Sequence, residues 1–389
     1  MRRLLILALL VFSDPLSWAQ ERVTPPQDFD QVAAQAEAAR GASRIEEAMG
    51  LYRKALSLKP GWAEGWWYLG TLLYERDAYA DAAPAFREAA ALNPKVGTAW
   101  VMLGLCEFKL GRHQDALEHM QRGRRLGAGA QPQFRHVMLY HEGLLLLDKG
   151  EFERAQQTLG LLSDEGVENE DLITALGRSV LRLHSSDLLA GDSALRQLVR
   201  RAGRAEYLAG QKKFREALGE YERLTTEFPQ GRNVHYALGR FFVTSQPDPE
   251  RAVAAFQREL ENSPDHVPAH LGIAAVKSSS DPAAALRHAE EAVQLNPRIP
   301  LGHYLLGSLL LDANQTERAI RELEIARRSF PNEPSVYYAL GRAYARANRK
   351  QDAEHARATF KRLTAEIQEA EQSGRGRASK AAEANPPQQ

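Results

Sequence analysis

The chain has 389 residues, with 50 Lys and Arg against 50 Asp and Glu, so its formal net charge at pH 7 is zero. This balance gives no indication of a nucleic-acid partner or an acidic substrate, both of which a strongly basic surface would favour. The single cysteine, Cys106, excludes an intramolecular disulfide and a cysteine metal cluster, and we expect it to be a buried apolar residue. The length exceeds that of an ordinary single core, but a repeat array escapes this limit because each repeat contacts only its neighbours.

The first residues have the pattern of a secretory signal peptide. Residues 1–3 (Met-Arg-Arg) form a short basic region, residues 4–12 form an apolar run, and residues 17–19 (Ser-Trp-Ala) resemble a cleavage site. The apolar run is shorter than the ~20 residues that a membrane-spanning helix needs. We therefore expect cleavage between Ala19 and Gln20 and export of the mature chain to a bacterial periplasm, with secretion or peripheral association with the envelope as alternatives.

Residues 63–96 organise the rest of the sequence. They predict two short amphipathic helices joined by a polar turn, and proline at the end stops the second helix. The apolar and small residues recur at helical spacing, namely Trp66, Leu69, Gly70 and Leu73 in the first helix and Ala82, Phe86 and Ala89 in the second. Isolated helices below ~12–15 residues are marginal in water, so this hairpin must pack against copies of itself.

Copies recur at a spacing of 34 residues. The spacing separates Trp66 from Trp100, Gly70 from Gly104, Pro60 from Pro94, Gly307 from Gly341, and Pro297 from Pro331. In its Trp, Leu-Gly, Ala, Phe, Ala and Pro positions the chain resembles the tetratricopeptide repeat family. The resemblance covers about residues 29–366. It implies an all-α, right-handed solenoid of about ten helix–turn–helix repeats.

The repeat spacing also suggests how the chain is divided. The expected segments are a signal peptide (1–19), a polar lead-in (20–28), an N-terminal repeat array (29–169), an irregular stretch (170–197), a C-terminal array with a capping helix (198–366), and a disordered tail (367–389). In the irregular stretch, polar and glycine-containing segments interrupt the second half of the repeat. Two interpretations stay open for it, a degenerate packed repeat and a hinge.

No complete catalytic or metal-binding motif is present. His141 and Glu142 begin the zinc-protease pattern HExxH, but Leu145 stands where the second histidine is required. His266 and His270 have a spacing that could hold a metal from one helix turn; we expect them to be surface histidines. The sequence has no GxSxG motif and no phosphate-binding glycine loop. We therefore predict no catalytic residue, no cofactor and no metal.

Four arginines follow one another at helical spacing, namely Arg196, Arg200, Arg201 and Arg204. They could attract an anion, or they could form an ordinary solvated helix face, which is the interpretation we favour.

The resemblance assigns a binding role to one face of the array. In this family the first helix of each hairpin lines the concave side, and its fifth, ninth and twelfth residues point into the groove. The matching positions are Trp67, Thr71, Tyr74, Val101, Leu105, Phe108, Tyr140, Leu144, Leu147, Tyr236, Arg240, Tyr304, Ser308, Tyr338 and Arg342. An aromatic residue occupies the fifth place in five repeats. The alternative is that neighbouring helices cover these positions.

The predicted function is a non-enzymatic scaffold that binds a protein or peptide in the groove. A scaffold component of an envelope complex for polysaccharide export or outer-membrane assembly is the alternative, and a glycan ligand would distinguish it. The Lys/Asn clamp that some members of the family use for a terminal carboxylate is absent from the best-matching repeats. Neither a nucleic-acid partner nor a membrane span in the mature chain is expected.

Overall fold

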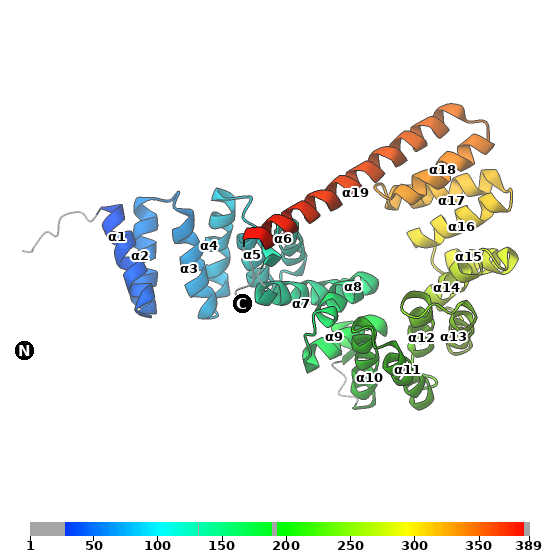
Figure 1. The fold of residues 1–389 in the computed structure, drawn as a ribbon, viewed down its shortest axis with the longest axis horizontal. Coiled ribbons are helices and arrows are strands. Elements are labelled where there is room, and N and C mark those ends of the chain that lie inside the picture. Colours follow the sequence, from blue (N-terminus) through cyan, green and yellow to red (C-terminus); the bar gives the residue numbers. More distant parts are fainter. Residues whose placement is uncertain (1–27, 131, 189–192, 385–389) are drawn as a thin grey trace, which may run out of the picture. The chain divides into compact units, whose positions relative to one another are not determined.

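The computed structural model describes residues 28–130, 132–188 and 193–384. The expected signal peptide, its cleavage site at Ala19 and Gln20, and nearly all of the polar lead-in lie outside these residues. Where it is described, the chain consists of α-helices, two short 3₁₀ turns and their connections, without a β-strand. Consecutive helices lie side by side within each unit (Figure 1), which confirms the predicted all-α repeat solenoid.

The chain divides into two compact units, Met1–Pro94 and Lys95–Gln389. The first unit contains four helices in two hairpins. Their bounds are α1 Phe29–Gly41, α2 Ile45–Leu58, α3 Ala63–Glu75 and α4 Tyr79–Leu92.

The second unit contains the remaining helices. Their bounds are α5 Gly97–Lys109, α6 His113–Arg125, η1 Ala128–Ala130, α7 Pro132–Asp148, α8 Phe152–Asp164, α9 Glu170–Val180, η2 Ser185–Leu188, α10 Ser193–Gly210, α11 Phe214–Glu227, α12 Val234–Thr244, α13 Pro249–Asn262, α14 Val267–Lys277, α15 Pro282–Leu295, α16 Pro300–Asp312, α17 Thr316–Ser329, α18 Pro334–Arg346 and α19 Lys350–Ala384.

Glycine lets the two helices of a hairpin approach each other closely. A Cβ atom added to Gly70 would lie 2.9 Å from the ring of Phe86, which is fully buried on the facing helix. In α13, Phe256 lies between two glycines, because a Cβ at Gly239 would meet its ring at 2.6 Å and a Cβ at Gly272 would meet it at 2.7 Å. These contacts confirm that the recurrent small residues of the sequence mark helix–helix contacts.

A hydrogen bond to a proline carbonyl fixes the start of several hairpins. In each case a ring N–H or a phenol O–H donates to the carbonyl oxygen of the proline six residues earlier. The pairs are Trp66–Pro60 (2.8 Å), His235–Pro229 (2.9 Å), His270–Pro264 (3.0 Å), His303–Pro297 (2.9 Å) and Tyr337–Pro331 (2.8 Å). Each proline follows the end of one helix, and each donor lies in the first turn of the next helix. The bond therefore ties the hairpin to the turn that precedes it.

The irregular stretch 170–197 is tightly packed. A Cβ at Gly177 in α9 would lie 1.9 Å from the carbonyl oxygen of Val199 in α10, and a Cβ at Gly203 would lie 1.8 Å from that of Ile173. The helices therefore touch backbone to backbone, which favours the packed alternative over a hinge. The short turn η2 lies in the connection after α9, and the 18-residue α10 packs against both α9 and α11.

The expectation of a disordered tail over 367–389 is wrong for most of its length. Helix α19 continues to Ala384, and only residues 385–389 lie outside the described part of the chain. The sequence from Glu369 onward is rich in Ala, Glu, Lys and Arg, which are strong helix formers, and its next proline is Pro386. Gly374 and Gly376 each disfavour the helix by about 1 kcal/mol, which the neighbouring residues offset.

Candidate functional site

The structure separates the predicted groove residues by exposure. Four of them are core residues, so their prediction as groove residues is wrong. The exposed fraction is 0% for Val101, 2% for Leu105 and 6% for Tyr236, and Leu147 is fully buried. Half-buried residues are Trp67, Thr71, Tyr74, Phe108, Tyr140, Leu144, Arg240, Tyr304 and Ser308, whereas Tyr338 and Arg342 are exposed. The sequence could not separate these classes, because a residue opposite a glycine is covered whatever its place in the helix.

Two of the buried positions are covered in different ways, Val101 by a close helix approach at a glycine and Tyr236 by neighbouring rings. A Cβ at Gly123 would lie 2.4 Å from Val101, so the missing side chain leaves the space that Val101 occupies. The ring of Tyr236 lies 5.7 Å from that of Phe256 and 5.0 Å from that of His266. These side chains hold neighbouring helices together and are closed to a partner.

In the first unit, the three candidates make contacts with their own hairpin. The ring of Trp67 meets Phe86 edge-on at 5.5 Å, and the hydroxyl of Thr71 donates to the carbonyl of Trp67 at 2.9 Å. The rings of Tyr74 and Tyr79 lie 5.2 Å apart. Each side chain is therefore held in place while part of it stays open to solvent.

Near the C-terminus, the exposed candidates form a small aromatic and cationic surface. The guanidinium of Arg342 lies 6.0 Å from the ring centre of Tyr338 and pairs with Asp312 at 3.0 Å. Tyr338 itself is 55% exposed, and its ring lies 5.6 Å from that of Phe360. An exposed ion pair of this kind stabilises the fold by only about 0–1 kcal/mol, so Arg342 is available to a partner.

Phe108 and Tyr140, two predicted groove residues from different hairpins, both contact His141, to which sequence analysis gave no binding role. The ring of His141 lies 4.8 Å from Phe108 and 5.5 Å from Tyr140, with an edge-to-face arrangement in both cases. His113 stacks on the other side of Phe108 at 5.8 Å. Helices α5, α6 and α7 thus present one continuous aromatic surface.

A cavity of about 260 Å³ opens beside this surface, and we call it the Tyr140 pocket. Its lining is mostly apolar and comes from α7, α8 and the start of α9. The lining residues are His136, Val137, Tyr140, His141, Leu162, Val167, Asn169, Asp171 and Leu172. Small-molecule sites usually have volumes of about 300–1,000 Å³, so this pocket suits one apolar side chain better than a whole cofactor.

Two titratable groups of the Tyr140 pocket, the Tyr140 phenol and the His141 imidazole, favour their neutral forms. Burial, followed by the nearby Asp171 carboxylate, raises the pKa of the Tyr140 phenol. Burial also lowers the pKa of His141. The Nδ1–H of His141 donates to the carbonyl of Val137 at 2.8 Å, which leaves Nε2 as an acceptor.

Of these lining residues, sequence analysis selected only Tyr140 as a contact. Val137 and His141 lie within one helical turn of it on α7, so their neighbourhood could have been predicted from helical spacing. Leu162 and Val167 come from α8 and its connection to α9. Their position depends on how α9 packs, and the interrupted repeat pattern gave no signal for that packing.

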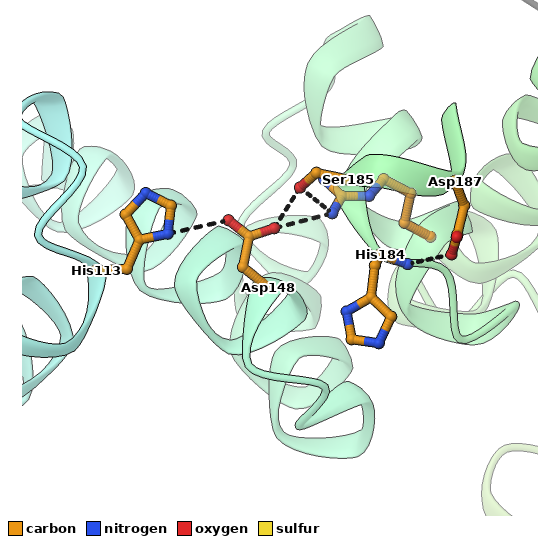
Figure 2. Close-up of polar contacts among 6 residues, drawn as sticks. His113, Asp148, His184, Ser185 and Asp187 are labelled. Carbon is orange, nitrogen blue, oxygen red and sulfur yellow. Dashed lines mark hydrogen bonds and ion pairs between the residues drawn. The ribbon is translucent and has the colours of Figure 1, made fainter. Parts of the chain in front are cut away.

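A polar cluster beside the pocket resembles a catalytic group only in composition. Figure 2 shows Asp148 between His113 and Ser185: His113 Nδ1 lies 3.6 Å from one carboxylate oxygen, and the Ser185 hydroxyl donates to the other. In a serine hydrolase the histidine stands between the serine and the acid, so that it can take the serine proton. Here the acid is central, and Arg178 donates to both Asp148 (3.3 Å) and Ser185 (2.9 Å). The cluster ties three successive hairpins together.

Three of the four arginines of α10, namely Arg200, Arg201 and Arg204, line a cavity of about 810 Å³ and are used within the fold. Arg200 pairs with Glu170 at 2.7 Å, and Arg204 pairs with Glu168. Arg201 pairs with Glu227 at 2.9 Å. Sequence analysis favoured a solvated helix face. The structure adds that acidic residues of neighbouring segments neutralise the arginines of that face.

The expectation of surface histidines is wrong for His266 and His270, which are 7% and 8% exposed. His266 Nδ1 accepts the backbone N–H of Ala269 at the start of α14, and its Nε2 lies 2.6 Å from the side-chain oxygen of Asn233. His270 uses Nε2 for the proline carbonyl described above. Cys106 is buried as expected, and burial raises the pKa of its thiol to about 12.

The model of one protein family, described as "Tetratricopeptide repeat", matches residues 33–95, 69–131, 202–267 and 304–366, which together make up more than half of the chain. The chain belongs to the tetratricopeptide repeat family. The unmatched stretch between 131 and 202 contains the Tyr140 pocket and the irregular α9–α10 pair. The family therefore accounts for the array, whereas the pocket lies where the chain departs from the common repeat.

Solved tetratricopeptide repeat structures are similar in fold. MamA is 16% identical with a TM-score of 0.39, covering 42% of this chain and 96% of its own. Yeast Tom70 is 13% identical with a TM-score of 0.33, covering 88% and 90%, respectively. Cut9, solved with Hcn1 as an APC/C hetero-tetramer, is 16% identical with a TM-score of 0.33, covering 87% and 79%. No curated protein sequence matches this chain.

The described residues contain neither a membrane-spanning helix nor a metal-binding group of side chains. None of the helices in residues 28–130, 132–188 and 193–384 is both long enough and apolar enough to cross a membrane. Over the same ranges, no group of three or more His, Cys, Asp or Glu side chains is placed to hold a metal ion. Tetratricopeptide repeat arrays act as scaffolds for protein–protein interaction, and they use extended surfaces for it.

Proposed function

We propose that this protein is a non-enzymatic scaffold that binds an extended segment of a protein partner and holds one apolar side chain of that segment in the Tyr140 pocket. The pocket is the observation that carries the proposal. Most of its open surface is apolar, it lies beside the half-buried aromatic surface of Phe108 and Tyr140, and Val137, which lines it, is 42% exposed. Such a surface suits contact with a protein, since aromatic residues dominate binding hot spots.

The expected affinity follows from the size of the pocket. Burying one Leu- or Phe-sized side chain contributes about 1.5–3 kcal/mol, whereas micromolar binding requires about 8 kcal/mol. The pocket alone is therefore insufficient. Further contacts along the array have to contribute, and the half-buried Tyr304 and the exposed Tyr338 and Arg342 are candidates for them in the same unit.

The experiment is a selection of peptides from a random displayed library on the purified protein. Enriched sequences are expected to share one large aliphatic or aromatic residue. Val137→Glu places a charge beside the pocket and is expected to weaken the selected peptides at least tenfold, because a buried charge without a partner is strongly disfavoured. Leu161→Glu is the matched control, since Leu161 is a similarly exposed apolar residue, 37% against 42%, that does not line the pocket.

The two variants decide the outcome together. Weakening by Val137→Glu alone supports the proposal. Equal binding by Val137→Glu and the native protein, with both folded by circular dichroism, would place the contact elsewhere.

We further propose that the protein works after export, in the periplasm of the cell envelope. The proposal rests on the short basic region 1–3, the apolar run 4–12 and the small residues around Ala19. Mass spectrometry of the protein from its native cells is expected to find an N-terminus at or within a few residues of Gln20. An intact Met1 on a cytosolic protein would contradict it.

A further inference from the structure

A further cavity lies beside the connection between α9 and α10, and we call it the Arg232 cleft. It has a volume of about 770 Å³, within the range of ligand sites. Its lining comes from the starts of α8 and α14 and from the connections α9–α10, α11–α12 and α13–α14, namely Phe152, Arg182, Leu183, His184, Asp187, Arg232, Asn233, Ser263, Asp265, His266, Val267 and Pro268. The cleft borders η2, the short turn between α9 and α10.

The floor of the Arg232 cleft is rigid and its hydrogen bonds are satisfied. The side-chain nitrogen of Asn233 donates to the carbonyl of Leu181 at 2.6 Å, and its oxygen lies 2.6 Å from His266 Nε2. Glu259 accepts the backbone N–H of Asn233 at 2.8 Å and that of Tyr236 at 3.1 Å. Since His266 Nδ1 is an acceptor, Nε2 carries the proton and the ring is neutral. Asn233 and the neutral ring of His266 line the floor without a charge, and the Glu259 carboxylate behind them is bound to two backbone N–H groups.

The walls carry the charges. Arg182 packs over the ring of Phe152 at 5.0 Å and pairs with Glu153, so its position is fixed. Arg232 is exposed and makes no ion pair within the described residues. On the acidic side, Asp187 already accepts the backbone N–H of His184 at 2.8 Å, as Figure 2 shows. Asp265 is exposed.

Two nearby arginines disfavour a positive charge at the floor. Burial, followed by the charges of Arg182 and Arg232, lowers the pKa of His266 to about 4, whereas the carboxylate of Asp265 acts in the opposite direction and is a smaller cause. The two arginines would attract a negative charge at the same place, although burial disfavours a charge of either sign. Arg232, which makes no ion pair within the described residues, is therefore the cation that an anion would contact.

We infer that the Arg232 cleft binds carboxylate groups of an acidic segment of a protein, with Arg232 as the contacting cation and Arg182 as its fixed neighbour. Arginine suits this task, because its planar fork matches a carboxylate with two parallel hydrogen bonds. The volume of the cleft admits more than one side chain, which favours a run of acidic residues over a single ion. This inference is independent of the Tyr140 pocket, which lies on different residues.

The probe is a fluorescent hexaglutamate peptide with blocked ends, added to the full-length mature protein and followed by anisotropy. Native protein is expected to bind it with an affinity that falls as salt is raised. Arg232→Gln is expected to weaken binding at least fivefold, and Asp265→Asn is expected to strengthen it. Arg258→Gln is the matched control, because Arg258 is an exposed arginine of α13 that pairs with Glu261 and does not line the cleft.

Three results would overturn the inference. One is equal binding by the native protein and Arg232→Gln. Another is weaker binding by Asp265→Asn, which would mean that Asp265 contributes to the contact instead of opposing it. The third is binding of inorganic phosphate at the same concentration as the peptide, which would assign the cleft to small oxyanions. Val137→Glu is expected to leave this binding unchanged, so failure here is distinguishable from failure of the proposed function.

Discussion

The closest approach of two helices, between α9 and α10, allows a sharp test of the packing. In Gly177→Ala the new Cβ would lie 1.9 Å from the backbone oxygen of Val199, and a backbone atom cannot move aside as a side chain does. Overpacking costs about 1–3 kcal/mol, and a backbone obstacle sets the value near the upper end. Replacing glycine by alanine inside a helix stabilises the helix by about 1 kcal/mol. The expected net loss of stability is about 2 kcal/mol.

Gly219→Ala is the matched control. Gly219 lies inside α11, and a Cβ there would meet nothing within 4 Å. The same chemical change should therefore stabilise the protein by about 1 kcal/mol, and the two variants should differ by about 3 kcal/mol.

The assay should resolve the array, since long repeat proteins depart from two-state unfolding. Hydrogen exchange measured segment by segment reports the local opening free energy. In Gly177→Ala the loss of protection should centre on α9, α10 and α11, because each repeat is coupled to its nearest neighbours. Equal stability of the Gly177 and Gly219 variants would refute the close approach of α9 and α10.

Three further predictions concern buried polar groups. The thiol of Cys106 is buried with a pKa of about 12, so it should not react with a disulfide reagent at pH 8 until denaturant unfolds the protein. Burial raises the pKa of Glu142 above its ordinary value of 4.5, so folding disfavours its ionised form. In urea titrations Glu142→Gln should therefore gain stability over the native protein as pH rises above 4.5, and this gain should vanish at lower pH. Glu259→Ala removes the acceptor for two buried N–H groups, at Asn233 and Tyr236, and should cost about 1–3 kcal/mol for each in the same titration.

The sequence predicted the repeated contacts well because they depend on local spacing. Gly70 and Phe86 face each other across one hairpin, and the helical period alone places them there. The candidate surface was harder to predict. Tyr236 occupies the same helical place as Tyr140, yet it is buried, because Phe256 and His266 from the following elements cover it.

The irregular stretch was the least predictable part. The contact that favours a packed repeat over a hinge joins Gly177 and Gly203, which are 26 positions apart, whereas Gly70 and Phe86 in a regular hairpin are 16 positions apart. Both cavities border this stretch, so the features that make it hard to predict from sequence are also those that create its binding surfaces. The tail was misjudged for a different reason, since composition alone does not distinguish a solvated helix from a disordered segment.

The hydrogen bonds to the proline carbonyls have a consequence for how this array can vary. Trp66, His235 and Tyr337 differ in size and polarity, yet each reaches the carbonyl six residues earlier with one N–H or O–H group. What these three residues share is a flat ring with a donor group that reaches the carbonyl oxygen. The identity of the residue matters less than this geometry. Phenylalanine, which has the same shape without the donor, is the substitution that such a position should not accept. Repeats that look unrelated by residue identity can be aligned by this rule.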